Sequence, residues 1–128
     1  MSSETSLHIL IVDDEDIIHR TLGMFLEELG HTVDGAWNGI SALEAVEANN
    51  YDLALVDVRM PGMDGLALLE RVREVCPNLS TVIMTGHGDP AMTEKATELG
   101  ALDFLTKPVG LMDLMDLLGK IDRPENQA

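Results

Sequence analysis

The sequence predicts a doubly wound α/β domain, in which a five-stranded parallel sheet carries five helices on its two faces. Five short apolar runs alternate without exception with five amphipathic stretches, and each crossover is long enough for a βαβ unit. The 128 residues, 45% of them hydrophobic, suffice for one domain with a single sizeable core. Aromatic residues make up only 3% of the chain, so we expect an aliphatic core.

The first half of the chain predicts two strand–helix pairs. Residues 7–12 form a nearly continuous apolar run, as expected for a strand covered on both faces. The acidic residues that follow favour a helix N-terminus, and apolar residues recur at spacings of three and four through 17–29, before Gly30. Residues 32–36 predict a weaker, more exposed strand, and residues 40–48 predict the second helix.

The second half repeats the alternation three times. Pro77 and Gly100 each follow an amphipathic stretch and are expected to end a helix. In the last helix, we expect the apolar residues at positions 111, 114, 115, 118 and 121 to face the sheet. Strands are predicted over 53–56, 81–85 and 102–105, and helices over 66–75, 92–99 and 111–121.

Composition narrows the class of partner. The net charge of −15 would repel phosphate backbones, which argues against direct nucleic-acid binding and favours basic partners or a bound metal. Cys76 is the only cysteine, so no disulfide can form within the chain, which favours a reducing compartment. No apolar run approaches the roughly 20 residues of a membrane span, and the N-terminus lacks a positive region. We therefore expect a cytoplasmic protein with no membrane partner.

Polar side chains stand at the carboxyl ends of four predicted strands, where functional groups collect in an open parallel sheet. Three close carboxylates repel one another, and a divalent cation would remove that repulsion. Oxygen ligands without Cys or His select a hard ion, and Mg²⁺ fits best. The strand ends carry Asp13 and Asp14, Asp57, Thr85, and Lys107.

This combination predicts a phosphoryl-transfer site, although each residue alone has an ordinary explanation as a helix cap, a strand former or a solvated charge. A carboxylate such as Asp57 can act as the nucleophile and form an aspartyl phosphate. Lys107 and the Thr85 hydroxyl could contact the phosphoryl oxygens, and Gly86 leaves room for the group to approach. The chain has no P-loop, so ATP is not expected to be the direct donor.

These motifs resemble the receiver domains of two-component response regulators over essentially the whole chain, from Leu7 to Ile121. The resemblance implies a flavodoxin-like receiver fold, with a receiver domain over 1–121 and a polar C-terminal tail over 122–128. It rests on the Asp13-Asp14 pair and the segments DVRMPGMDG, MTGHGD and GALDFLTKP.

The resemblance implies a role for each acidic residue. Asp57 would be the phosphoacceptor and would receive its phosphoryl group from the phosphohistidine of a sensor histidine kinase. Asp14, Asp57 and the backbone carbonyl of Arg59 would bind Mg²⁺ directly, whereas Asp13 would act mainly through water. The side chains of Arg59 and His87, two residues beyond Asp57 and Thr85, are expected to tune the lifetime of the phosphoryl group.

The resemblance also implies a switch. Thr85 would be the switch hydroxyl, Lys107 the phosphate-binding lysine, and Phe104 the aromatic side chain that turns inward on activation. The face made by helix four, strand five and helix five would then change and bind a downstream partner, an effector domain or a second copy of the chain. The peptide bond from Lys107 to Pro108 is expected to be cis.

Three functions remain open. The first is a signalling module, not an enzyme beyond self-phosphorylation from small phosphodonors and slow autodephosphorylation. The second is a small Mg²⁺-dependent phosphohydrolase, but Arg59 stands where such enzymes usually carry a second Asp. The third is a flavodoxin-like binder of FMN, which the acidic residues 13–16 would repel. The segments VIMTGHGD and DFLTKP look most like receivers attached to transcriptional activators, so the chain either works alone or is part of a longer regulator.

Overall fold

The computed structural model describes residues 6–60, 63–86 and 90–121, which form one parallel sheet between two layers of helices. The strands are β1 (His8–Val12), β2 (Thr32–Ala36), β3 (Leu53–Asp57), β4 (Ser80–Thr85) and β5 (Asp103–Thr106). The helices are α1 (Asp16–Glu28), α2 (Gly39–Ala48), α3 (Gly65–Val75), α4 (Pro90–Glu98) and α5 (Leu111–Leu118). The predicted tail over 122–128 lies outside the described residues.

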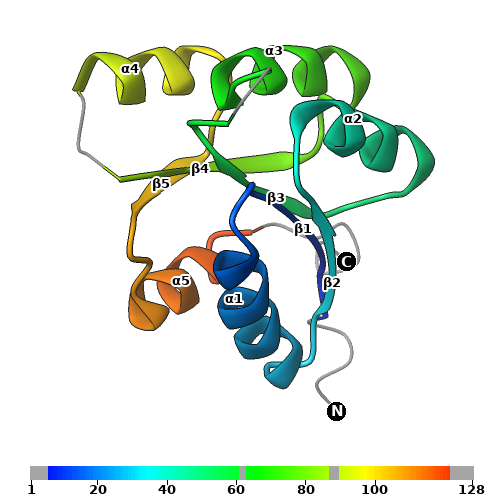
Figure 1. The fold of residues 1–128 in the computed structure, drawn as a ribbon, viewed down its shortest axis with the longest axis vertical. Helices are drawn as coiled ribbons and strands as arrows, with labels where there is room; N and C mark the ends of the chain where they lie inside the picture. The colour runs from blue at the N-terminus through cyan, green and yellow to red at the C-terminus, as the bar shows by residue number, and fades with distance from the viewer. Residues whose placement is uncertain (1–5, 61–62, 87–89, 122–128) are drawn as a thin grey trace.

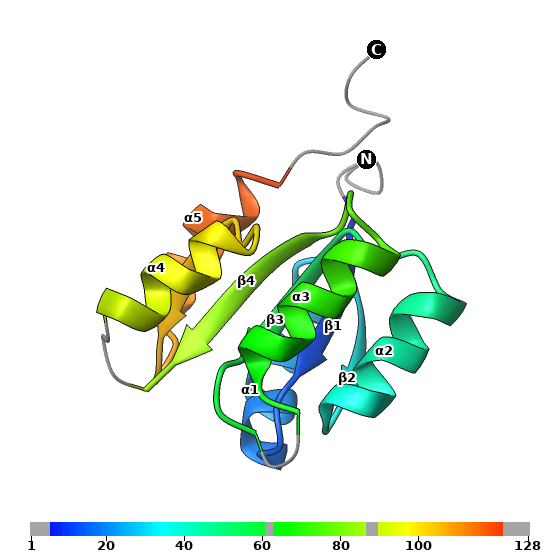
Figure 2. The ribbon, with the colours of Figure 1, turned by 90° about the horizontal axis from the view of Figure 1, so that it is seen from above.

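The sheet has the order β2-β1-β3-β4-β5, with every neighbouring pair parallel. Figure 1 shows α2, α3 and α4 on one face and α1 and α5 on the other, and Figure 2 shows the first three side by side. This is the doubly wound architecture predicted from the alternation of strands and helices, and it is the flavodoxin-like fold that the resemblance to receiver domains implies. From β1 the chain continues to β2 on one side of the sheet, and from β3 it continues to β4 and β5 on the other side. In such sheets, ligands bind beyond the carboxyl ends of the two strands at which this direction reverses, here β1 and β3.

Two apolar layers hold the sheet between its helices. Alternate residues of β1 point to opposite faces, so Leu10 packs beneath α2 and α3, whereas Ile11 packs against α1 and α5. The central strand β3 is buried along its whole length, because helices cover both of its faces. The polar Asp57 at its end is therefore presented from a rigid, fully packed element.

The last helix corrects one sequence expectation. It ends at Leu118 rather than at residue 121, and Leu111 and Met115 are about half exposed. Leu114 packs against the sheet as expected, and Leu118 and Ile121 are partly buried against the same layer, whereas Leu117, which was not among the expected inward residues, is also buried there. None of the helices in the described part of the chain has the length and apolar character needed to cross a bilayer.

Candidate functional site

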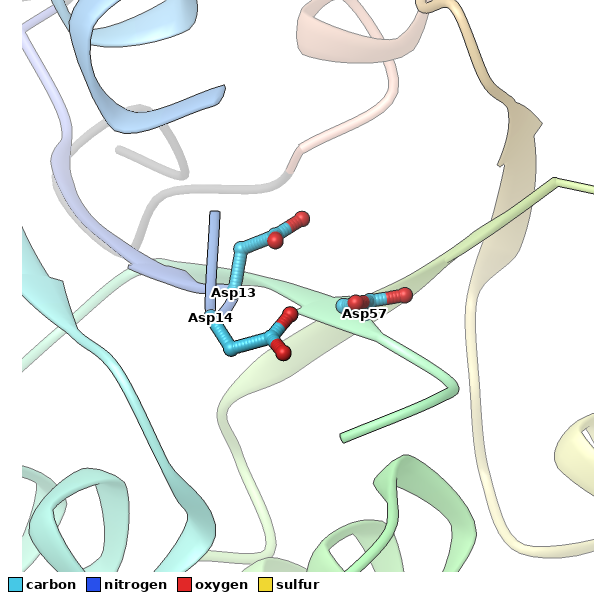
Figure 3. Close-up of side chains that lie close together, drawn as sticks. All are labelled: Asp13, Asp14 and Asp57. Atoms are coloured by element: carbon cyan, nitrogen blue, oxygen red, sulfur yellow. The ribbon is translucent and has the colours of Figure 1, made fainter. Parts of the chain in front are cut away.

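Three carboxylates meet at the carboxyl ends of β1 and β3. Figure 3 shows the side chains of Asp13, Asp14 and Asp57 extending into the same space. One carboxylate oxygen from each residue lies within 4.8 Å of the other two. Asp13 and Asp57 are buried, whereas Asp14 is exposed at the rim. Because β1 and β3 are neighbours in the sheet, Asp57 lies close to Asp13 and Asp14, although more than 40 positions of the chain separate it from them.

Hydrogen bonds to both the backbone and the side chain of Asp13 fix this residue in place. Its N–H donates to the Ala36 carbonyl at 3.1 Å, and its Oδ1 accepts from the backbone N–H of Glu15 at 2.9 Å. Its Oδ2 is buried and makes no hydrogen bond within the described part of the chain. Lys107 Nζ lies 2.8 Å from that oxygen, so the contact is an ion pair without hydrogen-bond geometry. The Lys107 ammonium is therefore the charged group that balances this buried oxygen.

Asp57 is 5% exposed and stands at the end of β3. Burial raises the pKa of its carboxyl, and the charge of Asp13 adds to this increase. The backbone N–H of Arg59, which donates to Asp57 Oδ1 at 3.3 Å, and the Lys107 ammonium act in the opposite direction. Gly65 allows the chain to fold back here, because a Cβ on this residue would lie 2.5 Å from the Asp57 carbonyl oxygen.

Lys107 is the cation shared by the cluster. Its Nζ donates to Glu15 Oε1 at 3.1 Å and lies 3.4 Å from Asp57 Oδ2, in addition to the contact with Asp13. Burial by itself lowers the pKa of Lys107, but the carboxylates of Asp13 and Glu15 outweigh burial and raise it. The Lys107–Pro108 peptide bond is cis, as expected. Glu15 was not predicted as a site residue, and its position directly after the Asp13-Asp14 pair is the signal that could have identified it.

Thr85 and Phe104 lie on the same face of neighbouring strands. Thr85 is 3% exposed at the end of β4, and its carbonyl accepts from the Lys107 backbone N–H at 2.7 Å. Phe104 on β5 stands opposite Ile83, which points into the layer beneath α4. Residues two apart on a strand share a face, so Phe104 lies on the same side of the sheet as Thr85. Its ring is 46% exposed.

The acidic residues suit a hard divalent cation. Two oxygens bound to one Mg²⁺ at its usual distance are at most about 4.2 Å apart. The carboxylate oxygens of Asp13, Asp14 and Asp57 are within 4.8 Å of one another, so small side-chain rotations or one bridging water suffice. Oδ2 of Asp13, which is paired with the Lys107 ammonium, and the exposed carboxylate of Asp14 supply acceptors for this purpose.

Of the two predicted tuning residues, Arg59 belongs to the described part of the chain. The Arg59 side chain is exposed beside the cluster, directly after the buried Asp57 and Val58. His87 lies outside the described residues. Sequence reasoning also missed His19, whose Nε2 lies 2.7 Å from the Asp13 carbonyl oxygen. Its place on the helix that follows the Asp pair gave no sign of this contact.

Known proteins match this chain over most of its length. The family described as the response regulator receiver domain matches residues 9–119. Sporulation initiation phosphotransferase F of Bacillus subtilis strain 168 is 37% identical over 112 residues, which covers 88% of this chain and 90% of that protein. A two-component response regulator from Clostridium difficile superposes with a TM-score of 0.88 at 30% identity, covering 94% of this chain and 99% of that chain.

Other relatives are much longer than this chain. The DNA-binding transcriptional regulator NtrC of Escherichia coli strain K12 is 38% identical over 110 residues. That match covers 86% of this chain but only 24% of NtrC. The similarity therefore concerns one domain of NtrC, and the activity of its remaining length does not carry over.

Proposed function

This chain belongs to the response regulator receiver domain family, and we propose that Asp57 accepts a phosphoryl group from the phosphohistidine of a sensor histidine kinase in a Mg²⁺-dependent reaction. The observation that carries this proposal is the position of Asp57. Its carboxylate is presented at the end of a fully buried strand, facing Asp13, Asp14 and Lys107. A nucleophile fixed in this way needs little reorganisation before attack.

The transfer follows from what surrounds this carboxylate. An Asp57 oxygen attacks phosphorus, the new O–P bond forms, and the N–P bond to the kinase histidine breaks. The Lys107 ammonium and the Thr85 hydroxyl are within the same rim and would stabilise the phosphoryl oxygens. Mg²⁺, held by Asp13, Asp14, Asp57 and the Arg59 carbonyl, would neutralise charge on the transferring group.

Phosphorylation of Asp57 would change the shape of the face formed by α4, β5 and α5. When phosphoryl oxygens draw the Thr85 hydroxyl inward, Phe104 turns from its half-exposed position into the space on the same face of the sheet. The face formed by α4, β5 and α5 then binds a downstream partner, an effector domain or a second copy of the chain.

Chemistry beyond phosphoryl acceptance is limited to self-phosphorylation from small donors and slow autodephosphorylation. A cytoplasmic location, favoured by the single Cys76, is part of this proposal.

A phosphohydrolase fits less well. Such an enzyme needs an acid–base group close to its nucleophile, and the residue two positions after Asp57 is the cation Arg59.

The test is phosphorylation with a small donor. Wild-type protein incubated with acetyl phosphate and Mg²⁺ should gain the mass of one phosphoryl group, and Asp57→Asn should gain none. Asp116→Asn, which changes an exposed carboxylate on α5, serves as the matched control and should behave as wild type. No gain in wild type, or an equal gain in Asp57→Asn, would overturn the proposal.

A further inference from the structure

The imidazole of His19 connects α1 to the peptide that carries the two adjacent carboxylates. His19 Nε2 lies 2.7 Å from the backbone carbonyl oxygen of Asp13. A carbonyl oxygen can only accept, so Nε2 carries the hydrogen and donates it. The ring is partly buried on the first turns of α1, directly behind the Asp13-Asp14 pair.

The His19 ring is fixed from two sides. It stacks on Trp37, with ring centroids 3.8 Å apart and an interplanar angle of 16°. The Trp37 indole is itself anchored, because its Nε1 donates to Asp16 Oδ1 at 2.7 Å. On β2, a Cβ at Gly35 would lie 2.6 Å from His19 Nδ1, so the missing side chain makes room for the ring. Figure 1 shows α1 beside β2.

This contact completes the restraint of the Asp13 backbone. The Asp13 N–H is held by the Ala36 carbonyl on β2, and the Asp13 carbonyl is held by His19 on α1. That carbonyl belongs to the peptide unit that leads into Asp14. The Asp14 carboxylate makes no hydrogen bond to other described residues and is exposed. Its position relative to Asp57 therefore depends on the orientation of this peptide.

We propose that His19, held in place by Trp37, is a positioning residue that fixes the Asp13–Asp14 peptide and thereby sets the Mg²⁺ affinity of the site. The inference rests on the proposed function, because it assumes that the acidic cluster binds Mg²⁺. Groups that orient metal ligands without touching the metal commonly contribute 10- to 100-fold in affinity. Residues from three segments hold the His19 ring in place for its hydrogen bond to Asp13. His19 itself lies on α1, Gly35 on β2 leaves space for the ring, and Trp37 after β2 stacks on it.

A second aromatic pair provides the matched control. His8 packs on Tyr51 with centroids 4.4 Å apart, at the opposite end of β1 from Asp13. Asp13 lies five residue steps along the chain from His8, which amounts to about 16 Å of extended strand. Tyr51→Phe should lower the stability of the protein without altering the acidic cluster.

Calorimetric titration of the metal-free protein with Mg²⁺ tests the inference. In His19→Leu, which removes the donor, the Kd for Mg²⁺ should rise about tenfold. In His19→Gln, which keeps an N–H donor, part of the affinity should return, and Tyr51→Phe should bind as wild type does. Trp37→Leu, which removes the stack and leaves His19 in place, should shift the Kd in the same direction as His19→Leu.

Trp37 is the only tryptophan, so its fluorescence gives an independent readout. Mg²⁺ should change its emission in wild type, and the change should be smaller in His19→Leu. Wild-type affinity and emission response in a folded His19→Leu, or an equal loss of affinity in Tyr51→Phe, would overturn the positioning role while leaving the proposed function intact. If His19→Leu does not fold, wild-type affinity in Trp37→Leu would overturn it. Wild-type protein that binds no Mg²⁺ would overturn both.

Discussion

The Lys107 ammonium lies 2.8 Å from the Asp13 carboxylate and so joins the residue after β5 to the residue after β1. The same ammonium contacts Glu15 at 3.1 Å and Asp57 at 3.4 Å. One cation therefore faces three carboxylates, with Asp14 as a fourth acidic neighbour. The cluster has excess negative charge, so its stability should increase when a carboxylate is removed or a cation is added, and decrease when the ammonium is lost.

Asp57→Asn should raise the free energy of unfolding of the metal-free protein by about 1 kcal/mol at neutral pH, because it removes a buried charge that Asp13 repels. The pKa of Asp57 is raised in the folded state, mainly by burial. A carboxyl with a raised pKa destabilises the fold when ionised, and this cost disappears as pH falls through its folded pKa. Urea denaturation in EDTA should therefore show the two proteins converging in acid. A variant less stable than wild type at neutral pH would contradict this account.

Mg²⁺ should stabilise the wild-type protein, because it binds the folded state alone. At a free concentration of 100 times its Kd, the gain should be about 2.7 kcal/mol. Asp14→Asn and Asp57→Asn should gain much less, since each removes a carboxylate of the cluster. Thermal unfolding with and without EDTA measures the difference, with Asp116→Asn as the control that should match wild type. An equal gain in Asp14→Asn would exclude that residue as a ligand.

Lys107→Met should destabilise the metal-free protein by up to about 3 kcal/mol, because the fully buried Asp13 carboxylate loses the cation beside it. Lys107→Arg keeps the charge and should lose less. Adding Asp13→Asn to Lys107→Met should recover part of the loss, since the orphaned charge is then absent. A double-mutant cycle compares wild type, Lys107→Met, Asp13→Asn and the double variant by chemical denaturation in EDTA. Strictly additive changes in the free energy of unfolding would show that Lys107 and Asp13 are not coupled.

Tyr51→Phe should cost about 1 kcal/mol at neutral pH, because the Tyr51 hydroxyl donates to Asp34 Oδ2 at 2.7 Å. This hydrogen bond is the main cause of the lowered pKa of Asp34, and His8, 3.0 Å from the same oxygen, adds to it. A lowered pKa stabilises the fold above the unfolded value, near 3.8, and that stabilisation is lost as pH falls through the folded pKa. The difference between the variant and wild type should therefore shrink in strong acid, as urea titrations at several pH values would show. A pH-independent difference would assign the loss to packing alone.

Arg59→Ala should change the lifetime of the phosphorylated protein, because it removes an exposed cationic side chain two residues from Asp57 while keeping the backbone N–H that donates to that carboxylate. His87→Ala, which changes the residue two positions after Thr85 in the sequence, is expected to act in the same way. The decay of the phosphoprotein after removal of the donor measures both effects, with the exposed Arg71→Ala on α3 as the control. Decay at the wild-type rate in both variants would exclude a tuning role.

The positions of the charged residues along the chain were predictable from sequence, whereas their pairing was not. Asp13, Asp57 and Lys107 each follow an apolar strand, and a parallel sheet brings strand ends to one edge. Which carboxylates contact the Lys107 ammonium depends on distances of a few ångströms. Glu15 therefore emerged as a partner of Lys107 only in the folded structure.

Helix orientation shows the same limit. The spacing of apolar residues in α5 correctly predicted that Leu114 faces the sheet, but Leu111 and Met115, also predicted to face it, are about half exposed, and Leu117 is buried although it was not predicted to be. A helix with apolar residues on most of its circumference can present several stripes, and packing against the sheet selects one of them.

The succession of strands and helices along the chain, the doubly wound class and the edge of the sheet on which the acidic residues lie could all be predicted from the sequence, because burial imposes a period on local sequence and parallel strands share one functional edge. The tertiary structure alone decided which side chains touch at that rim. His19 and Trp37 stack although 18 positions separate them, since α1 packs over β2 exactly where Gly35 leaves space for the ring. No local pattern encodes such a contact, because it depends on how two elements pack, and close packing is a property of the whole fold.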